Sequence, residues 1–128
     1  MTASVVRVVA ADEGPELGIV NGDGAARTIV WPGIGARHRS MHLISLHENA
    51  STVELRHPGE AVYYVLRGDG EAVDATSGES HPLGAGSMVH IGPETAYLIR
   101  ASGRYLELVG GPSPPDPALY RLAGEAPA

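Results

Sequence analysis

The stretch Ala61-Val62-Tyr63-Tyr64-Val65-Leu66-Arg67-Gly68-Asp69-Gly70-Glu71-Ala72-Val73-Asp74 decides the fold. Its first half is apolar and rich in Val and Tyr, and the residues after Gly70 alternate between polar and apolar side chains. Both halves favour β-strands. The glycines between them predict a tight turn, so we expect two antiparallel strands joined by a hairpin here.

The rest of the chain repeats this pattern of short apolar runs and turn signals, at a spacing of roughly ten residues. We expect an all-β sandwich or barrel. A last hairpin is predicted around Ser102-Gly103, and the prolines after Gly110 lack the amide donor that a central strand needs. One helical turn is predicted over 118–123. The remaining predicted strands span residues 4–10, 27–31, 37–47, 51–57, 88–91, 98–100 and 104–109.

Length and composition restrict the class of protein. A chain of 128 residues forms one domain, which we divide into an N-terminal strand and loop (1–26), a barrel core (27–111) and a proline-rich tail (112–128). The absence of cysteine excludes disulfides and thiolate sites. A net charge of −6 without a basic block argues against nucleic acid as a partner. Lacking a signal peptide or a membrane-length apolar segment, the protein is expected to be cytoplasmic, with no membrane partner.

Three polar residues are the main candidates for a site. His57 ends a predicted strand, Glu60 follows it, and Tyr97 lies on a returning strand, so the three side chains can converge at a barrel mouth. The competing interpretation makes His57 and Glu60 solvated loop residues beside Pro58-Gly59. His42 shares a strand face with His38, and both can equally be hydrogen-bonded strand residues.

Further residues are candidates for binding a substrate. Arg27 can clamp a carboxylate or form a surface ion pair. Because the chain has no Phe, the aromatic walls of a pocket must be Tyr or Trp, and Tyr63 and Trp31 are the candidates besides Tyr97.

Several motifs resemble those of cupins, and most closely those of ectoine synthase. They are His57-Pro58-Gly59-Glu60-Ala61-Val62-Tyr63, Gly68-Asp69-Gly70-Glu71 and Pro82-Leu83-Gly84-Ala85-Gly86. The resemblance implies a single cupin barrel (a double-stranded β-helix or jelly roll), a homodimer, and a metal, usually iron. It also implies cyclisation of an N-acetylated diamino acid with loss of water.

The resemblance also implies positions for metal ligands. The glutamate ligand of ectoine synthase falls on Glu60, whereas its tyrosine and histidine ligands fall on Val89 and Tyr97. In the general cupin pattern the four ligand positions are Leu55, His57, Ala61 and Tyr97, of which only His57 keeps the usual residue. A rebuilt site for iron or zinc would use Glu60, His57 and Tyr97, and the alternative is a site without metal. Arg27 and His42 fall on substrate-side positions.

The function expected from this site is that of a lyase-type cyclase or dehydratase acting on a small amine- or carboxylate-bearing metabolite. Glu60 would act as base, His57 or His42 as proton shuttle, and Tyr97 as donor to the developing oxyanion. Two alternatives remain open. One is a non-catalytic cupin that binds a small molecule between Tyr63, Tyr97 and Trp31. The other is a cyclase acting on a larger biosynthetic intermediate.

Overall fold

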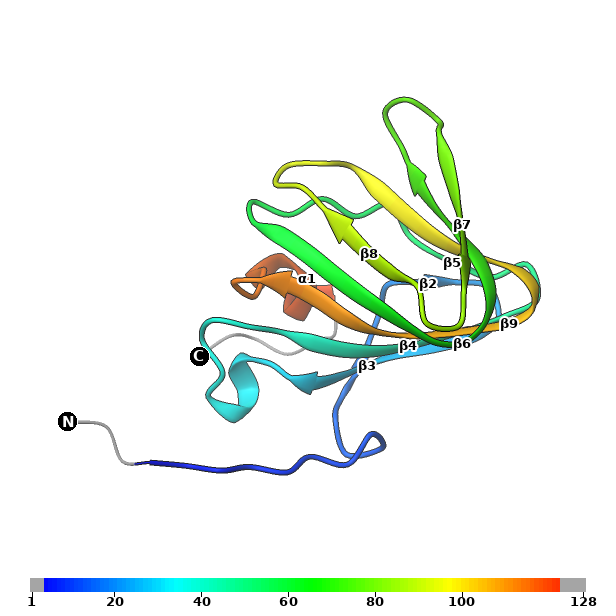
Figure 1. Ribbon diagram of the computed structural model, residues 1–128. Coiled ribbons are helices and arrows are strands. Elements are labelled where there is room, and N and C mark those ends of the chain that lie inside the picture. The colour runs from blue at the N-terminus through cyan, green and yellow to red at the C-terminus, as the bar shows by residue number, and fades with distance from the viewer. Residues whose placement is uncertain (1–3, 123–128) are drawn as a thin grey trace.

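The computed structural model describes residues 4–122 and confirms the expected all-β fold (Figure 1). Antiparallel strands make up most of the chain, with one 3-10 turn, η1 (Pro32–Ile34), and one short helix, α1 (Pro117–Leu122). The strands are β1 (Glu16–Leu17), β2 (Val20–Asn21), β3 (Gly24–Val30), β4 (Met41–His47), β5 (Ser51–Thr52), β6 (Glu60–Asp74), β7 (Ser80–Gly84), β8 (Met88–Ile91) and β9 (Tyr97–Ser113).

Two long strands organise the barrel. Strand β9 pairs with β4, β5 and β6, and β6 pairs in turn with β7 and β8 (Figure 1). Side chains alternate between the two faces of each strand, and the inward ones form a single core. The largest fully buried apolar members of that core are Leu17, Ile19, Ile44, Leu46, Val65, Ile99, Leu106 and Leu108.

The hairpin predicted between residues 61 and 74 is wrong, because β6 runs through the glycines without reversing. Its register against β9 shifts twice near Gly68, so the glycines mark bulges in one bent strand. Gly68 has φ 89°, and a Cβ there would lie 1.9 Å from the carbonyl oxygen of Tyr105. The sequence signal for glycine was real, but it reports a close approach of two backbones rather than a turn.

The predicted hairpin around Ser102-Gly103 is also wrong, since β9 continues to Ser113. Strand β9 also continues through Pro112, yet the prediction that the prolines exclude a central strand holds, because this end of β9 pairs on one side only. Pro112 pairs with Ala61 of β6, while β4 pairs with β9 only as far as Gly110. On that side the carbonyl of Pro112 accepts a hydrogen bond from the Ser40 hydroxyl at 2.6 Å.

Other predicted boundaries change as well. Residues 4–10 form no strand, and Val5, Val6 and Val8 are exposed in an extended segment below the barrel (Figure 1). The strand predicted over 37–47 begins only at Met41, and the one over 51–57 shortens to β5 and a bridge between Leu55 and Tyr97. The predicted helical turn is present as α1, although residue 123 and the end of the tail lie outside the described residues.

Helix α1 lies against the end of the barrel near β9 and β4 (Figure 1). Its Leu119 and Tyr120 are buried, with 4% and 1% of their surface exposed. None of the helices in the described part of the chain is long and apolar enough to cross a membrane.

Candidate functional site

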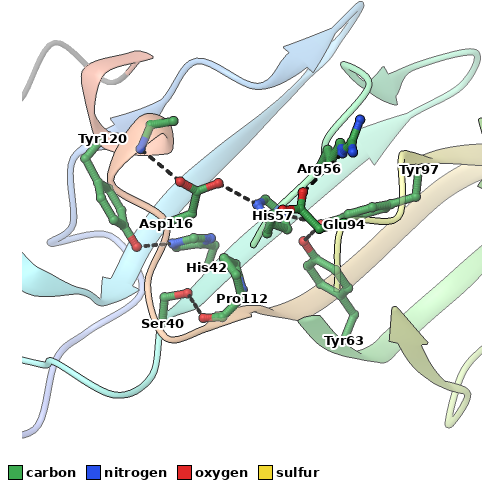
Figure 2. A network of polar contacts seen from close by, with 11 residues as sticks. Ser40, His42, Arg56, His57, Tyr63, Glu94, Tyr97, Pro112, Asp116 and Tyr120 are labelled. Atoms are coloured by element: carbon green, nitrogen blue, oxygen red, sulfur yellow. Dashed lines mark hydrogen bonds and ion pairs between the residues drawn. The ribbon is translucent and has the colours of Figure 1, made fainter. Parts of the chain in front are cut away.

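A chain of four buried polar side chains runs through the barrel (Figure 2). Asp116 Oδ2 lies 2.8 Å from His57 Nδ1, and His57 Nε2 lies 2.7 Å from the Tyr97 hydroxyl. The Tyr97 hydroxyl is in turn 2.6 Å from that of Tyr63. All four residues are at least nine-tenths buried. We call Asp116, His57, Tyr97 and Tyr63 the buried relay.

Chemistry fixes the direction of the hydrogen bonds in the relay when His57 is neutral. The Asp116 carboxylate can only accept, so Nδ1 of His57 carries the proton and donates. Nε2 is then the acceptor, and the Tyr97 hydroxyl donates to it. The Tyr63 hydroxyl completes the series by donating to Tyr97. A proton added at Nε2 reverses the bond between His57 and Tyr97, because Nε2 then donates, while Nδ1 continues to donate to Asp116.

Three separate elements bring these residues together. Tyr63 faces inward because it alternates with the exposed Val62 and Tyr64 on β6. The bridge between Leu55 and Tyr97 holds the chain two residues before His57 against the start of β9. Asp116 precedes α1, and its Oδ1 accepts a hydrogen bond from the backbone N–H of Ala118 at 3.1 Å, as a helix N-cap does.

Burial keeps the tyrosines of the relay protonated. Removal from water raises the pKa of Tyr63 to about 12, although its hydrogen bond with Tyr97 acts in the other direction. The pKa of Tyr97 is also raised above its usual range, first by burial and then by Tyr63 and the charge of Asp116. Both hydroxyls therefore carry their protons at neutral pH and can donate hydrogen bonds.

A second buried pair lies beside the relay. His42 Nε2 is 3.0 Å from the Tyr120 hydroxyl (Figure 2). The ring of Tyr120 packs on Trp31 with centroids 5.2 Å apart. Burial, and next the neighbouring His57, lower the pKa of His42 to about 4, so this imidazole is neutral at neutral pH. Burial raises the pKa of Tyr120 to about 12.

Glu60 is not part of this cluster. It begins β6 on the outward face, and its carboxylate pairs with His90 Nε2 at 2.5 Å, both side chains being more than half exposed. The strand period explains this position, because Ala61 and Tyr63 take the inward places. The structure thus brings together His57 and Tyr97 but separates Glu60 from both.

The substrate-side candidates are placed differently from one another. Tyr63 is within the relay. His42 lies outside the relay and is hydrogen-bonded to Tyr120 of α1. Trp31 packs against Tyr120. Arg27 alternates on β3 with the buried Ala26 and Thr28, so it faces away from the core, and its Nη1 donates to the carbonyl of Gly14 at 3.1 Å.

A cleft of about 520 Å³ opens beside Tyr97, between β7, β8 and the end of β6. Its volume is in the range of pockets that hold small molecules. Its wall is mixed. The apolar lining residues include Val73, Leu83, Val89 and Ile91, and the polar ones include Asp74, His81, Ser87, His90 and Thr95.

Solved structures share this arrangement of strands. A predicted oxalate decarboxylase from Thermotoga maritima superposes with a TM-score of 0.68 at 22% identity, over 82% of this chain and 96% of that one. An RmlC-like cupin from Methanocaldococcus jannaschii, described as a double-stranded β-helix, superposes with a TM-score of 0.67 at 14% identity, over 88% and 94%. The fold is that of a cupin.

The polyketide cyclase RemF from Streptomyces resistomycificus also has this cupin fold, with a TM-score of 0.60 at 22% identity over 90% of this chain and 83% of that one. No model of a known protein family matches the chain, and no curated protein matches it in sequence. The comparisons thus confirm the expected cupin barrel.

The donor set in the barrel does not fit the metal that the cupin resemblance implies. Of the four cupin ligand positions, Leu55 and Ala61 offer only apolar side chains, and Tyr97 is a protonated phenol. His57 already uses both ring nitrogens, toward Asp116 and Tyr97. Within residues 4–122, no three His, Cys, Asp or Glu side chains are grouped so that they could hold an ion. The set of Glu60, His57 and Tyr97 is therefore not assembled.

Sequence reasoning missed Asp116 and Tyr120. One signal was present, because Asp116-Pro117 just before a helical turn is a typical N-cap followed by proline at the first helical position. That signal predicts the start of a helix and a carboxylate at its N-terminus. It does not predict that the second oxygen of this carboxylate reaches His57.

Proposed function

We propose that the protein is a cupin-fold lyase of the cyclase or dehydratase type, which closes a ring on a small metabolite carrying an amine and a carbonyl group. The observation that carries the proposal is the buried relay, whose Tyr97 also lines the cleft of about 520 Å³. A carboxylate that orients an imidazole, which in turn contacts a hydroxyl, is a recurrent device for moving protons.

Closing a C=N bond transfers two N–H protons of the amine to the carbonyl oxygen, which leaves as water. Tyr97 accepts the first proton on its oxygen while passing its own hydrogen to His57 Nε2, and Asp116 stabilises the imidazolium. The reverse transfer protonates the alkoxide that forms when the amine attacks the carbonyl carbon. A second passage moves the remaining N–H proton to the departing hydroxyl and restores the relay.

The mixed lining of the cleft supports a substrate with both polar and apolar parts. Ser87 and Thr95 offer hydroxyls, and His81 and His90 offer imidazoles, in a lining that also includes the apolar Leu83 and Val89. The sequence suggested Glu60 as the base. We assign this role to Tyr97 instead, with His57 Nε2 accepting the hydrogen that Tyr97 gives up.

The test is a proton-NMR screen of amine-bearing carbonyl compounds for ring closure, including N-acetylated diamino acids and linear polyketide fragments. Tyr97→Phe should reduce turnover by about 10²- to 10⁴-fold, because it removes the atom that exchanges protons with the substrate. Tyr105→Phe, which removes a tyrosine hydroxyl outside both the relay and the cleft, should keep turnover within about tenfold of wild type. Normal turnover by Tyr97→Phe would refute the assignment.

A second candidate function is non-catalytic binding of a small molecule in the same cleft. It is favoured by the fact that Tyr97 is only 1% exposed, and that every fully buried side-chain nitrogen and oxygen in the described residues has a hydrogen-bond partner. A network so closed also suits a purely structural role. A compound that raises the melting temperature of wild type and Tyr97→Phe equally, without being converted, would favour this candidate.

A further inference from the structure

The cleft beside Tyr97 follows the edge of a strand. Six consecutive residues, from Ser87 to Gly92, line it, and they include the whole of β8. Successive side chains of a strand point to opposite faces, so a pocket on one face would be lined by every second residue. A cleft that every residue lines in turn runs along the edge of β8 instead. At a rise of about 3.3 Å per residue, this edge is about 17 Å long.

The edge of β8 that borders the cleft carries backbone groups that no strand pairs. In the described part of the chain β8 pairs only with β6 (Figure 1). The carbonyl of Ser87 accepts the N–H of Val65 on β6, which sets the phase of this ladder. Every second residue after Ser87, beginning with Val89, therefore bonds to β6. The N–H and C=O groups of Met88 and His90 point the other way, toward the cleft that these residues line.

The opposite wall of the cleft is the edge of β7. Its lining residues, 81–83, are again consecutive. The N–H of Asp74 donates to the carbonyl of Glu79, and counting in twos from this pair turns the backbone of Pro82 away from β6 and toward the cleft. Proline has no N–H, so this stretch of β7 offers a carbonyl alone. The edge of β8, with both donors and acceptors, is consequently the one that can pair with a further strand.

The charges around the cleft favour a ligand with a positive end. Among the described residues that line it, none is Lys or Arg, whereas Asp74 is acidic. Asp74 Oδ1 accepts the N–H groups of Thr76 and Ser77, which leaves Oδ2 as the acceptor for an ammonium group. Asp74 also pairs with Tyr97 in the ladder of β6 and β9, so the positive end of a ligand lies beside Tyr97.

We propose that the cleft binds an extended peptide of about four or five residues, which adds to β8 as an antiparallel strand. Its N–H and C=O groups bond to those of Met88 and His90, and its free amino terminus pairs with Asp74. The direction follows from the connection between β7 and β8, residues 85–87, which places the start of β7, next to Asp74, toward the end of β8 at Ile91. A peptide whose amino terminus lies there runs opposite to β8.

As a statement about the substrate, this inference rests on the proposed function, because Tyr97 lines the same cleft. Binding is measured without turnover, so the two can fail separately. A peptide that binds both wild type and Tyr97→Phe, and that neither protein converts, supports the peptide site and contradicts the lyase activity on this class of substrate. Conversion of a smaller amine by a protein that binds no peptide overturns the peptide site and supports the lyase.

Amide hydrogen exchange followed by NMR tests the proposal on wild type. The probe is a pentapeptide amide of alternating valine and serine with a free amino terminus, at ten times its Kd. In the free protein the amides of Met88 and His90 should exchange faster than those of Val89 and Ile91, which bond to β6. The probe should slow exchange at Met88 and His90 by about tenfold and leave the other two unchanged. Exchange that the probe leaves unchanged at all four amides would overturn the proposal.

A pair of substitutions at Met88 isolates one backbone donor. Met88→Pro removes its N–H at the first residue of β8, where a strand tolerates proline, and should weaken binding of the fluorescently labelled probe about tenfold. Met88→Leu is the matched control. It keeps the N–H and changes only a side chain that is 65% exposed, so its affinity should stay within about twofold of wild type. Equal affinities in two folded variants would contradict pairing at this edge.

Modified probes give a test that does not depend on the folding of a variant. A single N-methyl group, moved along the probe one residue at a time, should weaken binding to wild type at alternate positions, because only every second N–H of a strand faces β8. Acetylation of the amino terminus should weaken binding about fivefold or more, because it removes the charge that pairs with Asp74. A profile without alternation would overturn the proposal, and an acetylated probe that binds equally well would overturn its direction.

Discussion

His57 and Asp116, separated by 59 positions in the sequence, are joined by a hydrogen bond of 2.8 Å between Nδ1 and Oδ2. The other oxygen of the same carboxylate accepts the backbone N–H of Ala118 in the first turn of α1. One side chain thus fixes both the imidazole in the barrel and the helix that covers its end. Docking of the C-terminal segment and orientation of His57 are consequently parts of one event.

Asp116→Asn should lower the free energy of unfolding by about 2 kcal/mol, because a charge-assisted hydrogen bond to a buried imidazole is lost while the shape of the side chain is kept. Urea denaturation measures this. Asp74→Asn is the matched control. Asp74 accepts backbone N–H bonds from Thr76 and Ser77 in an exposed turn, and should lose about 0.5 kcal/mol. Equal losses in the two variants would contradict a special role for Asp116.

Tyr97→Phe should be more destabilising than Tyr63→Phe. Removing the Tyr97 hydroxyl leaves both His57 Nε2 and the Tyr63 hydroxyl without the partners they now have, and buried unpaired groups cost about 1–3 kcal/mol each. Removing the Tyr63 hydroxyl shortens the relay only at its end, with a loss of about 1 kcal/mol. Guanidinium denaturation of both variants and of the double variant gives the comparison. The order of the two losses is the critical result.

Acid should weaken the fold through His42. Its pKa falls from 6.5 to about 4 on folding. Between these values the unfolded chain binds more protons, so stability decreases as the pH falls from about 6.5 to about 4, by about 3 kcal/mol in total. At neutral pH the contribution of His42 to this dependence is absent. Chemical denaturation at a series of pH values measures the slope.

The control for His42 compares two substitutions. His42→Gln should flatten the dependence on pH in this interval, whereas His81→Gln, at an exposed ring paired with Glu79, should leave it nearly unchanged. If both variants keep the wild-type slope, another group is responsible for the acid sensitivity.

Gly68→Ala should destabilise the fold far more than Gly78→Ala. Both glycines have positive φ, so both substitutions carry a backbone cost of about 1–2 kcal/mol. A Cβ at Gly68 would also lie 1.9 Å from the Tyr105 carbonyl oxygen, whereas nothing lies within 4 Å of one at Gly78. The melting temperature of Gly68→Ala should therefore fall well below that of Gly78→Ala. Similar melting temperatures would show that the two strands can separate without cost.

Much of the fold could be predicted from local sequence. Short apolar runs between turn signals correctly indicated β3, β8 and the first half of β6. Alternation of apolar and polar residues correctly indicated β4 and the second half of β6, because burial of one face imposes a period of two on a strand. The glycines were correctly recognised as special positions. What they do was not predictable, since a glycine in a turn and a glycine under a crossing backbone have the same local signature.

The candidate site was predicted only in part. His57 and Tyr97 were expected to converge, and the structure places His57 Nε2 2.7 Å from the Tyr97 hydroxyl. Glu60 was assigned to the same place because it is near His57 in sequence, yet the strand that begins at Glu60 turns its side chain outward.

The sequence by itself determined an all-β chain of cupin type and supplied the histidine and tyrosines of the relay. Only the tertiary structure decided that Asp116 completes the relay, and that Glu60 belongs to the outer surface instead. The reason is physical. Strand periodicity acts between neighbours in the chain, whereas the partner of a buried donor is set by register shifts in β6 and by where the C-terminal helix docks.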